Sequence, residues 1–349
     1  MTLPIIFLSE VLLLYDQIHT LQPNKIAAFI EKNISLAKNS VWNSFGFANL
    51  IIKAASHLTY LETVNDEGIP SADILQYHIK DKIENTGVIH KNFVELTKKQ
   101  LKGLKVKKVI LILDETHEPF YGNINNNPIW VHEYKPEKGC TGSFKFLCAS
   151  IIFDDKRYFL DSIPLNIFYD MKKEVEKVLT TIESYGVGIE VALLDRGFSK
   201  SSEIINLLNQ RKLRYLMLYP DCENVKRIVK EVESYKRMPF EVKGIKTTLV
   251  IIRDEKYDWK FVTNLRFVDF VKYIKIYKKR WNIETGFRVA DEARIKTKSL
   301  DIRVRYFLFL IALVLYNIWY FLGKPVTFKR FVIRFFEILD EFASSEKIT

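Results

Sequence analysis

The chain has 349 residues, of which 48% are hydrophobic and 13% aromatic, with only 13 Gly and 10 Pro. This composition excludes a largely disordered chain and supplies enough apolar residues for two or three domains. The formal charge of +11 favours an acidic partner, nucleic acid before an anionic membrane. Three cysteines without a Cys-x2-Cys pair fit neither a disulfide framework nor a zinc site, and they indicate reduced thiols in the cytoplasm.

The first residues do not resemble a targeting signal. The stretch MTLPIIFLSEVLLLYDQ lacks a basic beginning, and Ser9 and Glu10 interrupt its apolar run. It is therefore a poor signal peptide, in keeping with a cytoplasmic protein.

Residues 1–100 are predicted to form a helical N-terminal domain. An apolar period runs through SVWNSFGFANLIIKAASHLTYLETV, followed by a break at NDEGIPS and a second helix at ADILQYHIKDKIE. Two helices around a glycine-containing turn are the outline of a DNA-binding helix-turn-helix. A plain helical bundle has the same outline, so both interpretations remain open.

From Lys105 the pattern changes to an alternation of strands and helices. The run VKKVILILDE is a buried strand, and FKFLCASIIFDD and RYFLDSIPLNIF form a hairpin. The helix MKKEVEKVLTTIESYGV, the strand IEVALLDRGF, the helix SSEIINLLNQRK and the strand RYLMLYP follow. This order predicts an α/β fold, a mixed sheet flanked by helices.

Residues 222–268 interrupt that rhythm with alternating antiparallel strands and turns, and they are predicted to form a β-rich insertion. Helical segments follow from Asp269. We therefore predict a catalytic core of residues 101–221 and 269–325 and a C-terminal helical tail of residues 326–349.

The apolar stretch YFLFLIALVLYNIWYFL, residues 306–322, permits two interpretations. Its 17 residues fall just short of the length of about 20 that spans a bilayer, and it contains Asn317. A buried helix of a large domain has the same pattern, and we expect no membrane association.

Two aspartates each follow a predicted buried strand. Asp114 ends the first strand in LILDETHEPFYG, and Asp195 ends a later one in LLDRGFSK. Acids at strand ends point into the crevice where open sheets bind their ligands. If the strands are neighbours, the two carboxylates require a cation between them, and magnesium accepts such oxygen ligands. The alternative is that each aspartate caps a turn or helix.

A third acid, Glu284, lies in the basic segment YKKRWNIETGFRVADEAR. Helical spacing places Tyr277, Arg280 and Glu284 on one stripe beside an apolar stripe. Window 271–305 has eleven Lys and Arg residues against four Asp and Glu, a net charge of +7. Glu284 therefore fits a metal ligand on a helix that contacts phosphates, or alternatively salt bridges to Arg280 and Arg288. Two divalent ions on three carboxylates suit in-line phosphoryl chemistry.

At these residues the sequence resembles a DDE transposase of the insertion-sequence type, archaeal or bacterial, with a ribonuclease H-like core. Tyr277, Arg280 and Glu284 match the spacing of the Tyr-x2-Arg-x3-Glu signature, and LDETHEPFYG and LLDRGFSK resemble the two aspartate motifs. The resemblance covers about residues 104–322. The family's final lysine falls at position 291, where this chain has Asp291.

The resemblance implies that Asp114, Asp195 and Glu284 are the catalytic and metal-binding triad and that Tyr277 and Arg280 contact DNA. The predicted DNA-binding residues together are Tyr277, Lys278, Lys279, Arg280, Arg288, Arg294 and Lys296.

The predicted function is that of a DNA transposase that cleaves phosphodiester bonds at transposon ends and joins the 3′-hydroxyls to target DNA. It would use two Mg²⁺ ions, with Mn²⁺ as a substitute. Its predicted partners are double-stranded transposon ends and target DNA, which it would bind as a homodimer in the cytoplasm, at the nucleoid. One alternative is a ribonuclease H-like nuclease that joins no strands. The other is a non-catalytic, transposase-derived DNA-binding protein, which the replacement of the family's final lysine by Asp291 would indicate.

Overall fold

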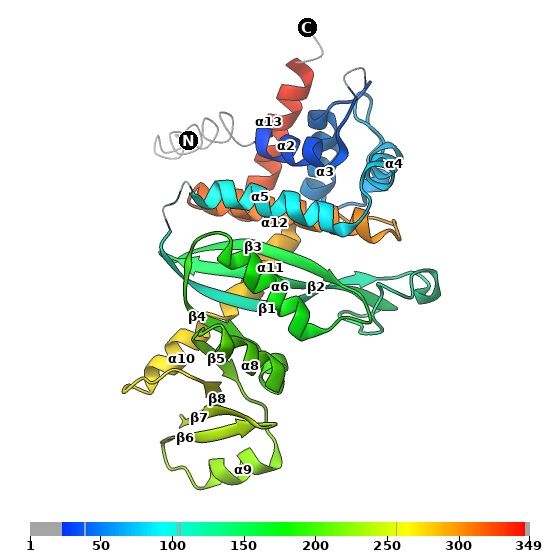
Figure 1. Cartoon of the computed structure of the whole chain (residues 1–349). Helices are drawn as coiled ribbons and strands as arrows, with labels where there is room; N and C mark the ends of the chain where they lie inside the picture. Colours follow the sequence, from blue (N-terminus) through cyan, green and yellow to red (C-terminus); the bar gives the residue numbers. More distant parts are fainter. Residues whose placement is uncertain (1–22, 38–39, 103, 105, 256, 346–349) are drawn as a thin grey trace, which may run out of the picture. The chain divides into compact units, whose positions relative to one another are not determined.

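The computed structural model describes residues 23–37, 40–102, 104, 106–255 and 257–345. These residues form two compact units (Figure 1). Of the described residues, the first unit comprises 23–37, 40–100, 122–130 and 287–345, and the second comprises 101–102, 104, 106–121, 131–255 and 257–286. Residues 1–17, which were predicted to be a poor signal peptide, lie outside the described residues.

The second unit is built on one mixed sheet with the strand order β3-β2-β1-β4-β5-β8-β7-β6. Strand β1 pairs in parallel with β4 and antiparallel with β2, and β4 pairs in parallel with β5. The strands are β1 (Lys108–Phe120), β2 (Gly142–Phe153), β3 (Lys156–Leu165), β4 (Gly188–Leu194), β5 (Tyr215–Leu218), β6 (Tyr235–Val242), β7 (Ile245–Arg253) and β8 (Asp258–Thr263). With its flanking helices, this sheet confirms the predicted α/β, ribonuclease H-like class.

The central strands form where the sequence has its longest apolar runs. Residues 109–113 of β1 are all buried, as expected for a strand covered on both faces. Strands β2 and β3 make the predicted hairpin, and Asp154 and Asp155 in its turn have φ values of 49° and 53°. Aspartate tolerates this left-handed conformation better than most residues, which suits it to the turn.

Helices connect and flank these strands. They are α6 (Met171–Glu183), α7 (Arg196–Ser199), α8 (Ser202–Gln210), α9 (Glu223–Lys230), α10 (Val271–Lys278) and α11 (Trp281–Ala290). The side chains of Asp170 and Ser201 accept backbone hydrogen bonds at the starts of α6 and α8, as such N-cap residues commonly do. Helix α11 begins in the second unit, and its last four residues belong to the first.

The β-rich insertion continues the sheet of the core. Strand β8 pairs antiparallel with β5, and β7 and β6 add to that edge in turn. Strands β7 and β8 are buried on both faces here, because the successive residues Phe261 and Val262, which point to opposite faces, are fully enclosed, as is Val250. The insertion is therefore part of the eight-stranded sheet.

The first unit is helical. Its elements are α2 (Pro23–Ile34), α3 (Ser44–His57), η1 (Leu61–Thr63), α4 (Ala72–Lys82), α5 (Thr86–Lys102), η2 (Ile124–Asn126), η3 (Asp291–Ala293), α12 (Ile302–Phe321) and α13 (Phe328–Ser345), and α5 extends two residues into the second unit. Helix α3 packs against α2 and α13, while α4 packs against α2 and α12.

The two helices of the predicted helix-turn-helix correspond to α3 and α4. Residues 58–71, including η1, connect them, which is longer than the three- or four-residue turn typical of that motif. The connection between α4 and α5 has only residues 83–85. DNA binding by this region stays a prediction.

The predicted domain limits and the compact units differ in one main respect. Residues 287–325, predicted to belong to the catalytic core, group with the N-terminal helices. The apolar stretch forms α12, the one helix among the described residues that is long and apolar enough to span a membrane, but 89% of its apolar window is buried inside the structure. That burial favours a core helix.

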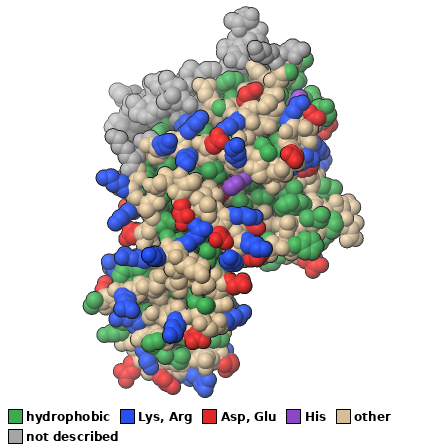
Figure 2. All heavy atoms as spheres, viewed as in Figure 1, with side chains coloured by type: hydrophobic (Ala, Val, Ile, Leu, Met, Phe, Trp, Pro, Cys, Tyr) green, Lys and Arg blue, Asp and Glu red, His purple; other side chains and the backbone are tan. Residues whose placement is uncertain are grey.

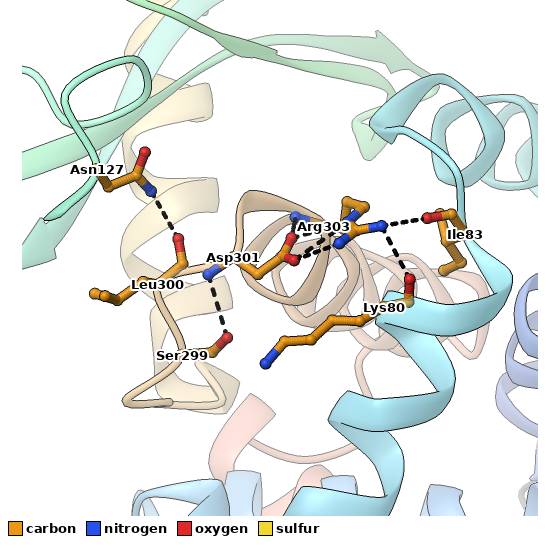
Figure 3. Close-up of polar contacts among 7 residues, drawn as sticks. All are labelled: Lys80, Ile83, Asn127, Ser299, Leu300, Asp301 and Arg303. Atoms are coloured by element: carbon orange, nitrogen blue, oxygen red, sulfur yellow. Dashed lines mark hydrogen bonds and ion pairs between the residues drawn. The ribbon is translucent and has the colours of Figure 1, made fainter.

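A polar clamp joins the start of α12 to the end of α4 (Figure 3). Asp301 caps α12 by accepting a hydrogen bond from the backbone N–H of Arg303, and the two side chains form an ion pair. Arg303 Nη1 also donates to the carbonyls of Lys80 and Ile83, at 3.1 and 2.7 Å. Carbonyls at a helix end lack intrahelical partners, so Arg303 satisfies two of them.

Candidate active site

The sheet register places the first two acids side by side. Strands β1 and β4 pair in parallel up to Leu113 and Leu194. Asp114 and Asp195 are the residues that directly follow these two paired segments. Asp114 does not end its strand as predicted, because β1 continues to Phe120 through its pairing with β2. Asp114 is instead the first residue of β1 beyond the segment that pairs with β4.

The alternative role of these aspartates as caps is not seen in the structure. Asp195 precedes α7, but its side chain makes no capping hydrogen bond there. Asp114 Oδ1 accepts a hydrogen bond of 2.9 Å from the backbone N–H of the next residue, Glu115, within the same strand. Both carboxylates therefore keep oxygens available for a cation.

The segment with the third acid is divided between two helices, whereas the sequence predicts one continuous stripe. Helix α10 ends at Lys278 and α11 begins at Trp281. Between them the backbone N–H groups of Lys279 and Arg280 bond to carbonyls three residues earlier, at 3.0 and 2.8 Å. These tighter turns place Arg280 at the junction and Glu284 in the first turn of α11.

The guanidinium of Arg280 connects the three acids. Its Nη1 lies 2.9 Å from Asp114 Oδ2, and its Nη2 lies 2.5 Å from Glu284 Oε1 and 3.6 Å from Asp195 Oδ1. Acids that are 170 residues apart in sequence thus converge on one cation.

The oxygen atoms of the three carboxylates are suitable ligands for a divalent ion. Three carboxylates supply the hard oxygen ligands that Mg²⁺ prefers, and they already surround a positive charge. Among the described residues, no three acidic, histidine or cysteine side chains lie close enough to hold an ion directly. The guanidinium occupies the space that separates the carboxylates, so an ion and Arg280 would compete for the same oxygens.

Burial has a large effect on Asp114. Removal from water raises the pKa of its carboxyl from 3.8 to about 7, although the charge of Arg280 opposes the shift and that of Asp195 adds to it. The side chain is 12% exposed, against 36% for Asp195 and 54% for Glu284. The three acids therefore form a gradient from a buried carboxyl to an exposed one.

Arg157 on β3 fixes α11 over the sheet. Its guanidinium donates a hydrogen bond to the backbone carbonyl of Asn282, in the first turn of α11. Arg157 could not be identified from the sequence, because nothing near it indicates that its partner lies 125 positions later.

The predicted DNA contacts differ in their exposure. Tyr277 is 1% exposed and Arg280 6%, and so neither faces solvent in this arrangement. Lys278 is exposed, with its Nζ 6.0 Å from the centre of the Trp259 ring, and Lys279 is half-buried. The other three predicted contacts, Arg288, Arg294 and Lys296, belong to the first unit.

The position of the family's final lysine is also described. Asp291 is exposed and begins the 3-10 helix η3, directly after the end of α11.

On the face shown in Figure 2, Lys and Arg side chains are interspersed with Asp and Glu.

Lys145 of β2 has partners other than the three acids. It forms an ion pair with Glu115 and donates a hydrogen bond of 2.8 Å to the hydroxyl of Tyr169. Glu115 follows Asp114 in the strand, and successive strand residues point to opposite faces. Lys145 therefore belongs to a polar cluster on the other face of the sheet.

Comparisons with known proteins identify the family of the chain. The family described as transposase DDE domain matches residues 105–318, which is more than half of the chain. No curated protein matches the sequence. A solved structure titled as the cryo-EM structure of a piggyBac transposase synaptic complex with hairpin DNA has a similar fold, with a TM-score of 0.58 and 13% sequence identity. The similarity covers 97% of this chain and 82% of that one.

The matched range contains both aspartates and Glu284, and members of this family are DNA-cleaving and DNA-joining enzymes that normally use divalent metal ions. The chain belongs to the transposase DDE domain family and is a DNA transposase.

Proposed function

We propose that Asp114, Asp195 and Glu284 are the catalytic triad of this transposase and together hold two Mg²⁺ ions, for which Mn²⁺ can substitute. The observation that carries the proposal is the convergence of the three carboxylates on one cationic centre, within 3.6 Å of Arg280. When bound, such ions activate the attacking oxygen and stabilise the leaving one.

The chain's own residues position the reacting groups. The β1–β4 register fixes Asp114 and Asp195, and Arg157 fixes the helix that carries Glu284. The basic residues Lys278 and Lys279, beside this helix, contact the phosphates of the bound strand. Phosphate contacts fix the register of a DNA strand without reading its sequence.

The proposed reaction has two steps at one site. Water first attacks a phosphodiester at the transposon end and frees a 3′-hydroxyl. That hydroxyl then attacks a phosphodiester of the target DNA, so that one bond is exchanged for another. Both ends must be cut and joined together, and we therefore propose a homodimer that bridges two DNA ends, acting in the cytoplasm at the nucleoid.

A strand-joining assay tests the proposal. The substrate is a labelled DNA end taken from inverted repeats that flank the gene, together with a supercoiled plasmid and Mg²⁺. The full-length chain is expected to yield labelled plasmid, and Asp114→Asn, Asp195→Asn and Glu284→Gln are each expected to abolish it. Asp154→Asn, in the exposed β2–β3 turn, is the matched control.

The same assay separates the alternatives. Cleaved ends without joined product would identify a nuclease. Binding without cleavage would identify a non-catalytic DNA-binding protein, and Asp291, where the family has lysine, is the residue that motivates this comparison.

A further inference from the structure

Arg280 is the most buried charged side chain of the candidate site, at 6% exposure. Moving a guanidinium out of water is unfavourable unless charged partners compensate. Here three carboxylates do so, and Asp114 and Glu284 accept short hydrogen bonds from it. Arg280 is thus the counterion of the three acids.

The surroundings of Arg280 keep it at this position. It lies in the junction between α10 and α11, and its guanidinium carbon is 5.6 Å from the centre of the Tyr277 ring. The Tyr277 hydroxyl lies 3.5 Å from the carbonyl of Leu194, the last residue of β4. The helix junction is therefore anchored to the strand that precedes Asp195.

The bonding of Arg280 is nevertheless incomplete. In the described part of the chain its buried Nε has no hydrogen-bond partner. An unsatisfied buried donor is destabilising, because it has lost its bond to water without gaining another. A phosphate group, by contrast, takes two parallel hydrogen bonds from a guanidinium.

We propose that Arg280 is an internal cation that occupies the metal site of the DNA-free enzyme and leaves it for a DNA phosphate, so that metal binding and DNA binding are coupled. The inference rests on the proposed role of the three acids. Asp114 Oδ2 and Glu284 Oε1 bond to the guanidinium, and the same oxygens are needed by a divalent ion. Metal ion and guanidinium therefore exclude each other, and one displaces the other as the cation.

The coupling is reciprocal. If a DNA phosphate draws Arg280 away from the acids, DNA raises the affinity for metal, and metal raises the affinity for DNA by the same factor. Couplings of this kind are typically about 5-fold to 150-fold. The consequence for the enzyme is that the hydrolytic site is assembled only on DNA.

The test measures Mn²⁺ binding, separately from activity. Full-length protein freed of metal is titrated with Mn²⁺, and free Mn²⁺ is followed by electron paramagnetic resonance, with and without a DNA duplex carrying the transposon end. We expect Arg280→Gln to bind Mn²⁺ at least about 5-fold more tightly than the natural protein when DNA is absent. DNA should raise the affinity of the natural protein by at least that factor and leave Arg280→Gln nearly unchanged.

Controls separate the two proposals. Arg237→Gln changes an arginine of β6 whose guanidinium contacts the carbonyl of Phe267, and it should behave like the natural protein. If Asp114→Asn leaves Mn²⁺ binding unchanged in the Arg280→Gln background, the acids are not the metal site and the proposed function fails. If binding depends on Asp114 but Arg280→Gln has unchanged or weaker affinity without DNA, the proposed function stands and the role of Arg280 is overturned.

A second measurement uses the natural protein, in case Arg280→Gln does not fold. The ¹⁵Nε resonance of Arg280 is assigned with the folded Arg280→Lys variant and recorded before and after addition of DNA with Mg²⁺. A large change in its chemical shift and hydrogen exchange supports the displacement. An unchanged resonance in the loaded complex overturns it.

Discussion

Replacing Asp114 by Asn removes the ionisable group from the most buried of the three carboxyls without changing its shape. A carboxyl pKa of about 7 in the folded protein, against 3.8 ordinarily, corresponds to a free-energy difference of up to about 4 kcal/mol. Burial is the main cause, and Arg280 only partly offsets it. The natural protein thus loses stability by holding an ionised carboxylate at this position.

The sign of the pH dependence follows from proton binding. Between about pH 4 and pH 7 the folded state retains a proton that the unfolded chain has released, so the stability of the natural protein falls as the pH rises. Asparagine does not titrate. The free energy of unfolding of Asp114→Asn, minus that of the natural protein, should therefore rise by up to about 4 kcal/mol across this window and then remain constant.

Urea denaturation followed by circular dichroism, at several pH values between about 4 and 8 and with EDTA present, measures this difference. Asp155→Asn removes an exposed carboxylate from the β2–β3 turn and controls for the change in net charge. A difference for Asp114→Asn that is constant with pH, or that falls as the pH rises, would show that burial does not raise the pKa of Asp114.

Three further predictions concern other parts of the chain. Burial, then the charges of Lys145 and His132, lower the pKa of His117 from 6.5 to about 4, so acidification through that window should reduce stability. The loss should be well below about 3 kcal/mol, because solvent screens this partly exposed ring, and His117→Gln should remove the dependence in the same pH series. Arg303→Met, which leaves two helix-end carbonyls without their donor, should lower the free energy of unfolding by about 1–3 kcal/mol in urea denaturation; an unchanged midpoint would contradict it. Leu313→Ala in α12 should destabilise by about 2–5 kcal/mol, and the natural chain should remain in solution without detergent; aggregation relieved only by detergent would favour the membrane interpretation.

The local elements and the types of the chemical groups could be predicted from the order of the residues. Apolar β-branched runs specify the strands, because each run is long enough to be buried on both faces of a sheet. The acids that follow these apolar runs and the Tyr277–Arg280–Glu284 spacing can likewise be recognised in the sequence. These features were sufficient to predict the α/β class and the family.

How those groups meet depends on long-range pairing and packing, which local sequence patterns do not show. The β1–β4 register, which brings Asp114 beside Asp195, depends on pairing between segments 80 residues apart. Arg280 was predicted to lie on a stripe beside the apolar one and to contact DNA, whereas the turn between α10 and α11 directs it inward to the acids. Helical periodicity describes regular backbone, and it cannot predict where two helices meet at a tighter turn or which buried charge will compensate three others.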